Sequence, residues 1–269
     1  MKEARHPDVI PVPSLLEVRE ELDEDGGVPL WRHPVWRQEF PWAVQGTTGR
    51  GSGPDPLDLG LSGATPVGVA LGRWRALRSA AGCVRVVHAR QVHGADVLPH
   101  GPGEPGIVVS DGFDGHATAT AGVLLTVSIA DCVPIFLLDP TRRAVAALHG
   151  GWRGVVAGVL EAGLALLERM AGTTAADLHL HLGPAICGAC YEVGPEVHEA
   201  LGLEPPSGHE PVDLRSVLAT RAVGLGVAAA RISVSSFCTK CGESPFFSHR
   251  GGDRERQMGV LGVRVSPGL

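Results

Sequence analysis

The sequence has no excess of positive charge, no long uninterrupted apolar run and no export signal. Its net charge of -6 gives no electrostatic footprint for a phosphate backbone, which argues against nucleic acid as a partner. The longest apolar stretch, from Val123 to Leu138, is interrupted by Asp131 and Pro134 and falls short of the roughly 20 residues that a membrane-spanning helix needs. The first residues lack the apolar centre of a secretory signal. We therefore expect a cytoplasmic protein with no membrane contact and a small-molecule substrate.

The composition is that of an ordinary folded protein, with 44% hydrophobic and 19% charged residues. A chain of 269 residues buries a large core without help from disulfides. Its six cysteines should be thiols in a reducing compartment, where closely spaced cysteines indicate metal or redox sites before disulfides. The cysteines are therefore candidates for chemistry.

Residues 1–38 differ from the rest of the chain and are predicted to form a short N-terminal extension. Several prolines precede an acidic segment, 14–22, in which Ser14 as a cap and the apolar spacing favour a short helix. Such surface extensions tolerate change, so we expect deletion of residues 1–38 to leave catalysis nearly unaffected. Residues 39–269 contain no repeat and no low-complexity segment, and are expected to form one mixed α/β domain.

The central part of the chain alternates between strand-like and helix-like segments. Short apolar runs bounded by Gly, Pro or Asp predict buried strands at 84–87, 123–129, 135–138, 144–148, 178–182 and 232–237. Helical spacing predicts helices over 155–170, from Pro195 onward, and over 214–230 after a cap at Asp213. Residues 43–56 are rich in Gly, Thr and Pro, which indicates a loop that offers Arg50 to a ligand.

Three residues of metal-binding type stand at predicted strand ends or turns: His93, Cys132 and His149. Two imidazoles and a thiolate suit zinc, and three protein ligands leave a fourth position for water or substrate. The spacing is equally compatible with hydrogen-bonded turn histidines and a buried core thiol. Cys132 and His149 are also compatible with a thiolate–imidazolium dyad that attacks an amide or ester.

Two further groups of possible metal ligands are less favoured. Cys-x-x-Cys pairs occur at Cys187 and Cys190 and at Cys238 and Cys241, the layout of a tetrathiolate zinc site. The segment between the pairs is much longer than in compact zinc ribbons and contains a predicted helix, so we expect these thiols not to hold a second zinc. The single His-x-His pair at 179–181 is not enough for a multicopper oxidase, which needs several such pairs.

Several segments together resemble the YfiH-type laccase-domain family over about residues 43–263. They are Gln91-Val92-His93-Gly94, Ala130-Asp131-Cys132-Val133-Pro134, His149-Gly150-Gly151-Trp152-Arg153-Gly154, Gly183-Pro184-Ala185-Ile186, Tyr191-Glu192-Val193-Gly194, Cys238-Thr239 and Phe246-Phe247-Ser248-His249-Arg250. Proteins of that family, once labelled polyphenol oxidases, are zinc-dependent purine nucleoside phosphorylases that can also deaminate adenosine. The resemblance implies a single layered α/β domain with a mixed sheet, zinc as cofactor, and phosphate and purine nucleosides such as adenosine, inosine and methylthioadenosine as substrates.

The resemblance also implies roles for particular residues. It makes His93, Cys132 and His149 the zinc ligands. Those expected to serve phosphate or the nucleoside are Arg50, Arg153, Arg250 and Gln91, with Arg153 at a predicted helix N-terminus that favours an anion.

Other candidates lie in the same segments. Trp152 and Phe247 are candidates to stack on a purine. Asp131, Glu192 and His249 are unranked candidates for the general acid. Two other functions stay open, a Cys132/His149 cysteine hydrolase and a non-catalytic zinc-containing nucleoside-binding protein.

Overall fold

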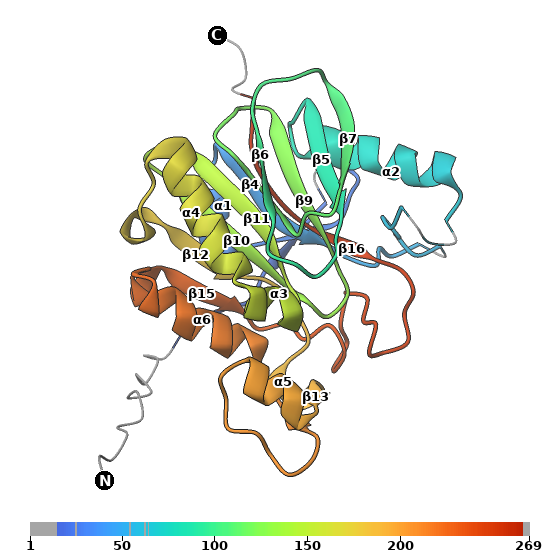
Figure 1. The fold of residues 1–269 in the computed structure, drawn as a ribbon. Helices are drawn as coiled ribbons and strands as arrows, with labels where there is room; N and C mark the ends of the chain where they lie inside the picture. Colours follow the sequence, from blue (N-terminus) through green and yellow to red (C-terminus); the bar gives the residue numbers. More distant parts are fainter. Residues whose placement is uncertain (1–14, 25, 54, 62, 64, 266–269) are drawn as a thin grey trace.

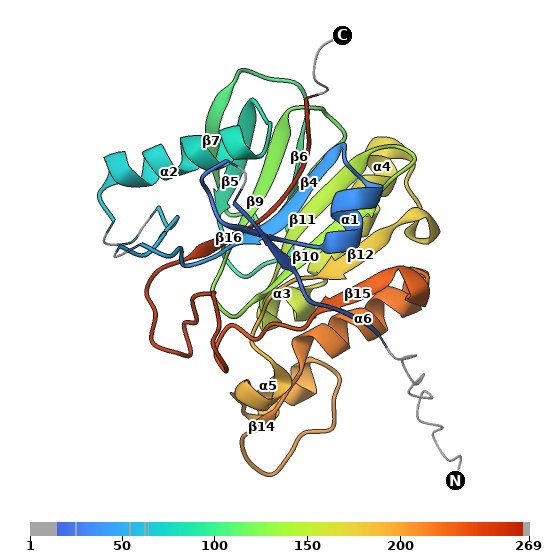
Figure 2. The same ribbon diagram turned by 180° about the vertical axis from the view of Figure 1, so that it is seen from behind.

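Two seven-stranded mixed sheets, stacked face to face, form the centre of the protein (Figure 1, Figure 2). The computed structural model describes residues 15–265 except 25, 54, 62 and 64. The predicted α/β class with mixed sheets in layers is confirmed. Within the described residues, no helix is both long and apolar enough to cross a membrane.

The first sheet joins strands from distant parts of the chain. Its spatial order is β1 (Leu16–Val18), β15 (Ile232–Ser235), β12 (His179–Leu182), β10 (Val133–Asp139), β11 (Ala144–Gly150), β8 (Gly115–Thr118) and β6 (Val97–His100). β12 is parallel to β15 and antiparallel to β10. Every residue of β10 and β11 is buried, which explains their continuous apolar sequences.

The second sheet has the same number of strands and the same mixture of directions. Its order is β2 (Glu21–Asp23), β3 (Leu30–Arg32), β4 (Ala43–Thr48), β16 (Gln257–Val263), β9 (Val123–Ile129), β5 (Arg85–Arg90) and β7 (Gly106–Asp111). β5 is parallel to both β9 and β7, whereas β16 is antiparallel to β4 and β9. The turns that follow β5 and β9 therefore leave the sheet at the same edge.

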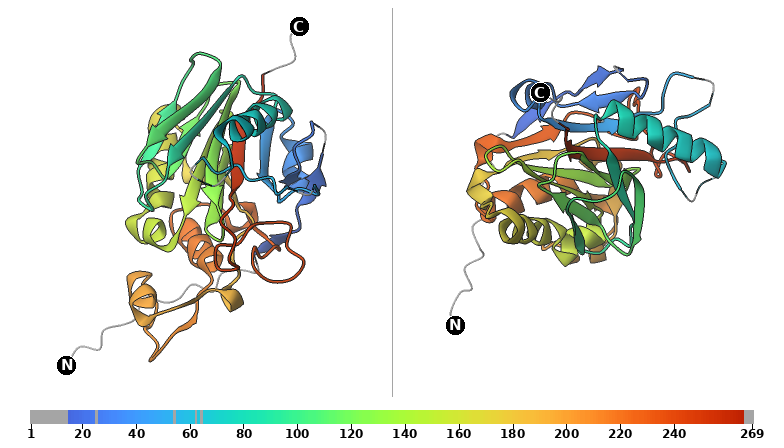
Figure 3. Two further views of the ribbon diagram at one scale, coloured as in Figure 1. Left: turned by 90° about the vertical axis from the view of Figure 1, so that its right-hand side faces the viewer. Right: turned by 90° about the horizontal axis from the view of Figure 1, so that it is seen from above.

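Three apolar clusters fill the spaces between the layers. Along β10, Phe136 and Leu138 point into the space between the two sheets, while Ile135 and Leu137 point to the helices outside, as the two-residue period of a strand requires. The outer side of the first sheet carries α3 (Trp152–Ala157), α4 (Val159–Ala171) and α6 (Leu214–Gly224), and that of the second carries α2 (Val67–Ala80). Figure 3 shows α2 on the far side of the sheets from α4.

The remaining elements are short. They are α1 (Pro34–Glu39), α5 (Pro195–Ala200), β13 (Glu192–Val193), β14 (Glu210–Pro211) and single turns of 3-10 helix at Ala175–Asp177, Gly188–Cys190 and Ala229–Arg231. β13 and β14 pair with each other apart from the two large sheets. Trp36 of α1 packs into the cluster between the sheets.

Most predicted strands and helices are present, with some changes of extent. The strand predicted at 123–129 is β9 without change. The helix predicted over 155–170 is interrupted, because Gly158 adopts φ 87 and ends α3 before α4 begins. The helix after Asp213 ends at Gly224, well before residue 230.

The loop predicted over 43–56 is wrong in its first half. Ala43–Thr48 is β4, a buried strand between β3 and β16. Gly46 belongs there because a Cβ at this position would lie 2.6 Å from Cγ of Leu30. The glycine that suggested a loop is thus required by close strand packing.

The helix predicted over 14–22 is also wrong. Residues 16–18 and 21–23 are the strands β1 and β2, one in each sheet, while Ser14 lies outside the described residues. Pairing with β15 and β3 overrides the local helical spacing. The described part of residues 1–38 is therefore built into both sheets.

Glu20 fastens this segment to the first sheet. Its side chain is 2% exposed. One carboxylate oxygen meets Nε2 of His181 at 2.9 Å, and the other accepts a hydrogen bond of 2.8 Å from the hydroxyl of Ser235. Deletion of residues 1–38 would leave these buried groups without the Glu20 carboxylate, so we expect the deletion to lower stability.

We expect Glu20→Ala to lower the free energy of unfolding by about 3 kcal/mol, because the buried Nε2 of His181 and the buried hydroxyl proton of Ser235 both lose their partner. Glu17→Ala is the matched control, since Glu17 is exposed on the same segment. Urea unfolding followed by circular dichroism measures both variants. Equal stability of Glu20→Ala and Glu17→Ala would contradict the assignment.

Candidate metal centre

The three predicted metal ligands come together at one end of the stacked sheets. His93 lies in the turn after β5, and Cys132 lies in the turn between β9 and β10, which carries the chain from the second sheet to the first. His149 lies in β11, opposite Pro134 of β10. One ligand atom from each of the three residues lies within 4.8 Å of the others. Topology thus joins residues that are far apart in sequence.

A buried carboxylate, Asp114, organises the cluster. It accepts hydrogen bonds from the backbone amides of Val92, His93 and Gly94 at 3.0, 2.9 and 2.7 Å, and from Nδ1 of His149 at 2.8 Å. Burial opposes ionisation of Asp114, yet these donors hold its pKa below the ordinary value. Because Nδ1 of His149 is occupied, Nε2 is the nitrogen left for a metal.

The sequence analysis missed Asp114. Its only signal was an acidic residue within Asp111-Gly112-Phe113-Asp114-Gly115, a pattern typical of any turn. The structure also shows why the amides converge on it, since His93 has a positive φ of 60. A residue with a side chain keeps that conformation only where surrounding contacts enforce it.

Cys132 and His149 each shift the pKa of the other toward the charged form. Burial raises the pKa of the Cys132 thiol, but the adjacent imidazoles of His149 and His93 outweigh it and lower that pKa to about 6. Burial lowers the pKa of His149, but the Cys132 thiolate and the Asp114 carboxylate outweigh it and raise that pKa to about 9. Cys132 is therefore held as the thiolate, the form that binds metals and acts as a nucleophile.

Gly151 lets the candidate ligands lie close against the backbone. A Cβ at this position would lie 2.8 Å from Cδ2 of His93 and 3.2 Å from Sγ of Cys132. No side chain fits between the backbone and the ligand cluster. The donor set of two imidazoles and one thiolate, with space kept beside it, fits a metal ion with three protein ligands and one open position.

Two pockets meet at the cluster. The narrower one has a volume of 150 Å³ and the wider one 530 Å³. His93, Ala130, Cys132 and His249 line both of them. A metal at this position is therefore reached by ligands from two sides.

Arg153 and Arg250 line the narrower pocket. The guanidinium of Arg153 lies 4.4 Å from the ring centroid of Trp152, and that of Arg250 lies 5.0 Å from the ring of Tyr191. Among the described residues, neither arginine has a carboxylate within ion-pair distance. The rings restrain both cations, and the Arg250 guanidinium also donates to the carbonyl of Glu192 at 3.1 Å. Neither contact cancels the positive charge, which stays available to an anion.

Gln91 lines the wider pocket and fixes the end of β9. Its side-chain amide donates to the carbonyl of Ser128 at 3.0 Å and accepts from the amide of Ser128 at 2.6 Å. Both polar ends of this side chain are thus engaged with the neighbouring strand. Gln91 holds together the two turns that carry His93 and Cys132.

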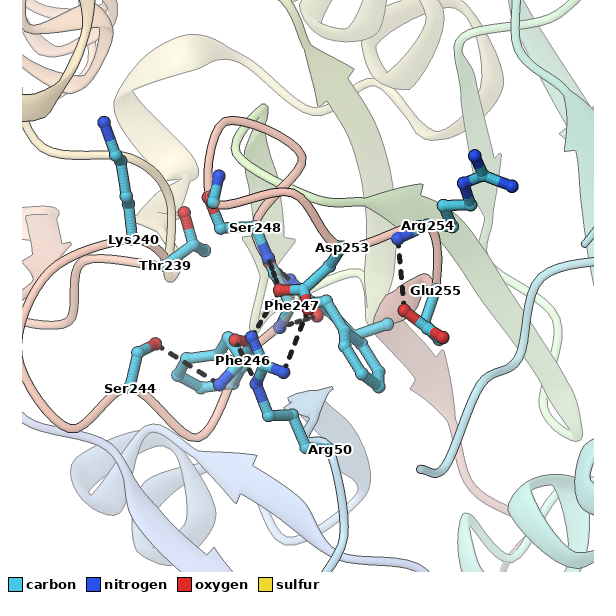
Figure 4. Close-up of polar contacts among 12 residues, drawn as sticks. Arg50, Thr239, Lys240, Ser244, Phe246, Phe247, Ser248, Asp253, Arg254 and Glu255 are labelled. Atoms are coloured by element: carbon cyan, nitrogen blue, oxygen red, sulfur yellow. Dashed lines mark hydrogen bonds and ion pairs between the residues drawn. The ribbon is translucent and has the colours of Figure 1, made fainter. Parts of the chain in front are cut away.

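Arg50 has a different setting from the other two predicted arginines. Figure 4 shows its guanidinium on the carboxylate of Asp253, which it contacts through both terminal nitrogens, and on the carbonyl of Phe246 at 2.8 Å. Its charge centre lies 4.9 Å from the ring of Phe247, which is only 1% exposed and has no face left for a purine. Arg50 is absent from the lining of both pockets.

The three candidate acids are also separated. Asp131 is buried in the wall of the narrower pocket, and its two oxygens accept from the Thr239 hydroxyl at 2.6 Å and from the Arg250 amide at 2.7 Å. Glu192 lies outside the lining of both pockets. Of these three residues, His249 alone faces both pockets.

The described histidines do not build a copper centre at 179–181. Nδ1 of His181 meets the hydroxyl of Ser233 at 2.9 Å, and its Nε2 meets Glu20. Both ring nitrogens are therefore engaged within the chain. By contrast, the structure does bring together the sulfur atoms of the two Cys-x-x-Cys pairs.

The layered fold and the cluster of two imidazoles and one thiolate define a candidate metal protein with three ligands. Residues 55–264 match the family described as "Multi-copper polyphenol oxidoreductase laccase", and the chain belongs to that family. The resemblance to YfiH-type laccase-domain proteins is thereby confirmed.

Similar proteins include two named enzymes and a solved structure. The purine nucleoside phosphorylase YlmD of Geobacillus stearothermophilus is 34% identical over 199 residues, covering 67% of this chain and 73% of that protein. Adenosine deaminase RL5, from an unknown prokaryotic organism, is 34% identical over 172 residues, covering 59% of this chain and 62% of that protein. The crystal structure of YlmD from Geobacillus stearothermophilus matches with a TM-score of 0.81 and 29% identity, over 92% of this chain and 100% of that chain.

We expect Gly151→Ala to weaken metal binding by about tenfold or more, because the added methyl group displaces His93 from the cluster. Gly72→Ala is the control, since a Cβ at position 72 meets nothing within 4 Å. Competition with a chromogenic chelator measures the affinity of each variant. Unchanged affinity in Gly151→Ala would show that the cluster is not the metal centre.

Proposed function

We propose that this protein is a zinc-dependent purine nucleoside phosphorylase that also deaminates adenosine. The observation that carries the proposal is a three-ligand cluster at the junction of two pockets, one of which presents two arginines without carboxylate partners. Relatives named purine nucleoside phosphorylase and adenosine deaminase support it. Purine nucleosides and phosphate are accordingly the proposed substrates.

Zinc is the proposed metal, held by His93, Cys132 and His149. A soft thiolate with two imidazoles suits zinc better than the hard cations calcium and magnesium, which prefer oxygen ligands. Zinc in such a site supplies a Lewis acid or a bound water of lowered pKa. Asp114 engages Nδ1 of His149 and so leaves Nε2 to the metal, and Gly151 leaves room for the His93 and Cys132 side chains.

Arg153 and Arg250 are the proposed phosphate-binding residues. Phosphorolysis of an N-glycosidic bond brings a phosphate dianion to a sugar that becomes cationic, so the phosphate must be held in place beforehand. A guanidinium holds two phosphate oxygens at once, and stacking on Trp152 and Tyr191 limits its motion. Trp152, which lines the narrower pocket, remains the proposed residue to stack on a purine.

His249 is the proposed proton donor to the departing purine. It lines both pockets, whereas the oxygens of Asp131 are both engaged by other donors. Arg50 is a proposed positioning residue, because it ties Phe246 and Asp253 at the two ends of the loop that carries His249. Gln91 positions the turns of the metal ligands from the wider pocket.

We expect the purified protein to release hypoxanthine from inosine only in the presence of phosphate, and to lose this activity on zinc removal with recovery on zinc addition. Cys132→Ala should lose the zinc of this three-ligand site together with the activity, since one of three protein ligands is gone. Activity that survives zinc removal would instead support the Cys132/His149 cysteine hydrolase. Nucleoside binding without turnover by the zinc-loaded protein would support a binding protein.

We expect Arg153→Ala and Arg250→Ala to keep zinc but lose phosphorolysis by about 10²-fold or more, the scale for removing one preorganised charge contact to a reacting anion. Adenosine deamination, which uses water in place of phosphate, should fall less. Initial rates at varied phosphate concentration separate the phosphate KM from kcat. Equal losses in the two reactions would place these arginines on the nucleoside.

Arg50→Ala and Asp253→Ala should lose both reactions to a similar extent, because either change releases the loop of His249. Arg50→Lys should recover little, since an ammonium cannot hold both partners in the same geometry. If Asp253→Ala left phosphorolysis intact while Arg50→Ala abolished it, Arg50 would have to contact the substrate itself.

A further inference from the structure

Four cysteines outside the proposed active site form a second cluster. The sulfur atoms of Cys187, Cys190, Cys238 and Cys241 all lie within 4.8 Å of one another. All four are free thiols. None of them belongs to the cluster of His93, Cys132 and His149, and the inference drawn from them does not depend on the proposed function.

The topology explains why a long intervening segment does not keep the two pairs apart. β12 and β15 are parallel neighbours in the first sheet, and each is followed by one Cys-x-x-Cys pair. Beyond the strands, Ala185 still forms a parallel bridge with Cys238. The segment between the pairs folds into β13, α5, β14 and α6 and returns to the adjacent strand. The length of that segment is therefore no reason to expect that the two pairs cannot hold a second zinc together.

We propose that these four thiols are a second metal site, which binds zinc as a structural tetrathiolate centre. In a tetrahedral site with zinc–sulfur bonds near 2.3 Å, the sulfur atoms lie about 3.8 Å apart. Sγ of Cys187 lies 3.9 Å from Sγ of Cys241. This sulfur–sulfur distance thus matches that of a four-sulfur zinc site, and all four sulfur atoms lie within 4.8 Å of one another. A set of four thiolates with no histidine favours zinc among the non-redox metals.

The backbone around Cys238 provides a second, independent observation. Its sulfur accepts hydrogen bonds from the amides of Cys187 at 3.3 Å, Lys240 at 3.3 Å and Cys241 at 3.4 Å. Amide donors that converge on one sulfur stabilise a thiolate, as the second shell of a metal site does. A thiol that merely filled the core would not need them.

The position of the site gives it a structural role at the active-site wall. Cys190 is followed by Tyr191, whose ring supports Arg250 at 5.0 Å. Cys238 is followed by Thr239, which donates to Asp131 at 2.6 Å. Zinc bound to all four sulfurs fastens both turns to each other and so fixes the wall of the narrower pocket.

The experiment is zinc analysis of protein purified without added metal, in the wild type and in three variants. The wild type should hold about two zinc ions per chain, and Cys241→Ser and Cys132→Ala should each hold about one. Cys83→Ser, the control, changes a buried thiol outside both clusters and should retain both ions. Cys241→His, which keeps a ligand, should also retain both.

Some outcomes would overturn the inference. One is a single zinc ion per chain in the wild type that is retained in Cys241→Ser. Another is iron bound in place of zinc. If Cys132→Ala kept both ions while Cys241→Ser lost one, the first centre alone would be misassigned. Should Cys241→Ser fail to fold, cobalt substitution in the wild type decides, since four thiolates give intense charge-transfer absorption that two imidazoles and one thiolate do not match. Absence of that absorption would refute the site.

Discussion

The carboxylate of Asp114 is the constraint on which the rest of the site depends. A buried anion with no lysine or arginine partner is costly unless donors surround it, and here three backbone amides and one imidazole do so. The same contacts keep the strained turn at His93 and the tautomer of His149. His93 lies in the walls of both pockets. The shape of both pockets therefore depends on the side chain of Asp114, which lines neither of them.

The three predicted anion-binding arginines, Arg50, Arg153 and Arg250, have surroundings that differ in charge. They therefore differ in how much of their own charge is available to an anion. Arg50 is neutralised by Asp253 and engaged by a carbonyl, so its guanidinium has little left to offer an anion. Arg153 and Arg250 lie against aromatic rings, and Arg250 also donates to a carbonyl, but no carboxylate among the described residues cancels the charge of either. A glycine-rich loop around an arginine therefore does not by itself indicate a phosphate site.

The features that the sequence could predict are those determined by residues close together in the sequence. β9 and β11 were predictable because strands buried on both faces have continuous apolar sequences. β4 was missed because Gly46 is required by close packing against a neighbouring strand. β1 was missed because sheet pairing overrides helical spacing. The candidate metal ligands were recognisable through family-like segments, whereas Asp114 and the sulfur cluster depend on which strands are neighbours, which composition and spacing do not encode.

The central position of β16 governs the order in which the chain can be assembled. It is the last strand of the described residues, yet it lies between β4 and β9 in the middle of its sheet. Until it has emerged from the ribosome, both of these strands present an unpaired edge, the feature that promotes misassociation between chains. The two halves of the second sheet are thus joined only after β16 has been synthesised. A nascent chain that already carries His93, Cys132 and His149 therefore still has two open strand edges until β16 has emerged.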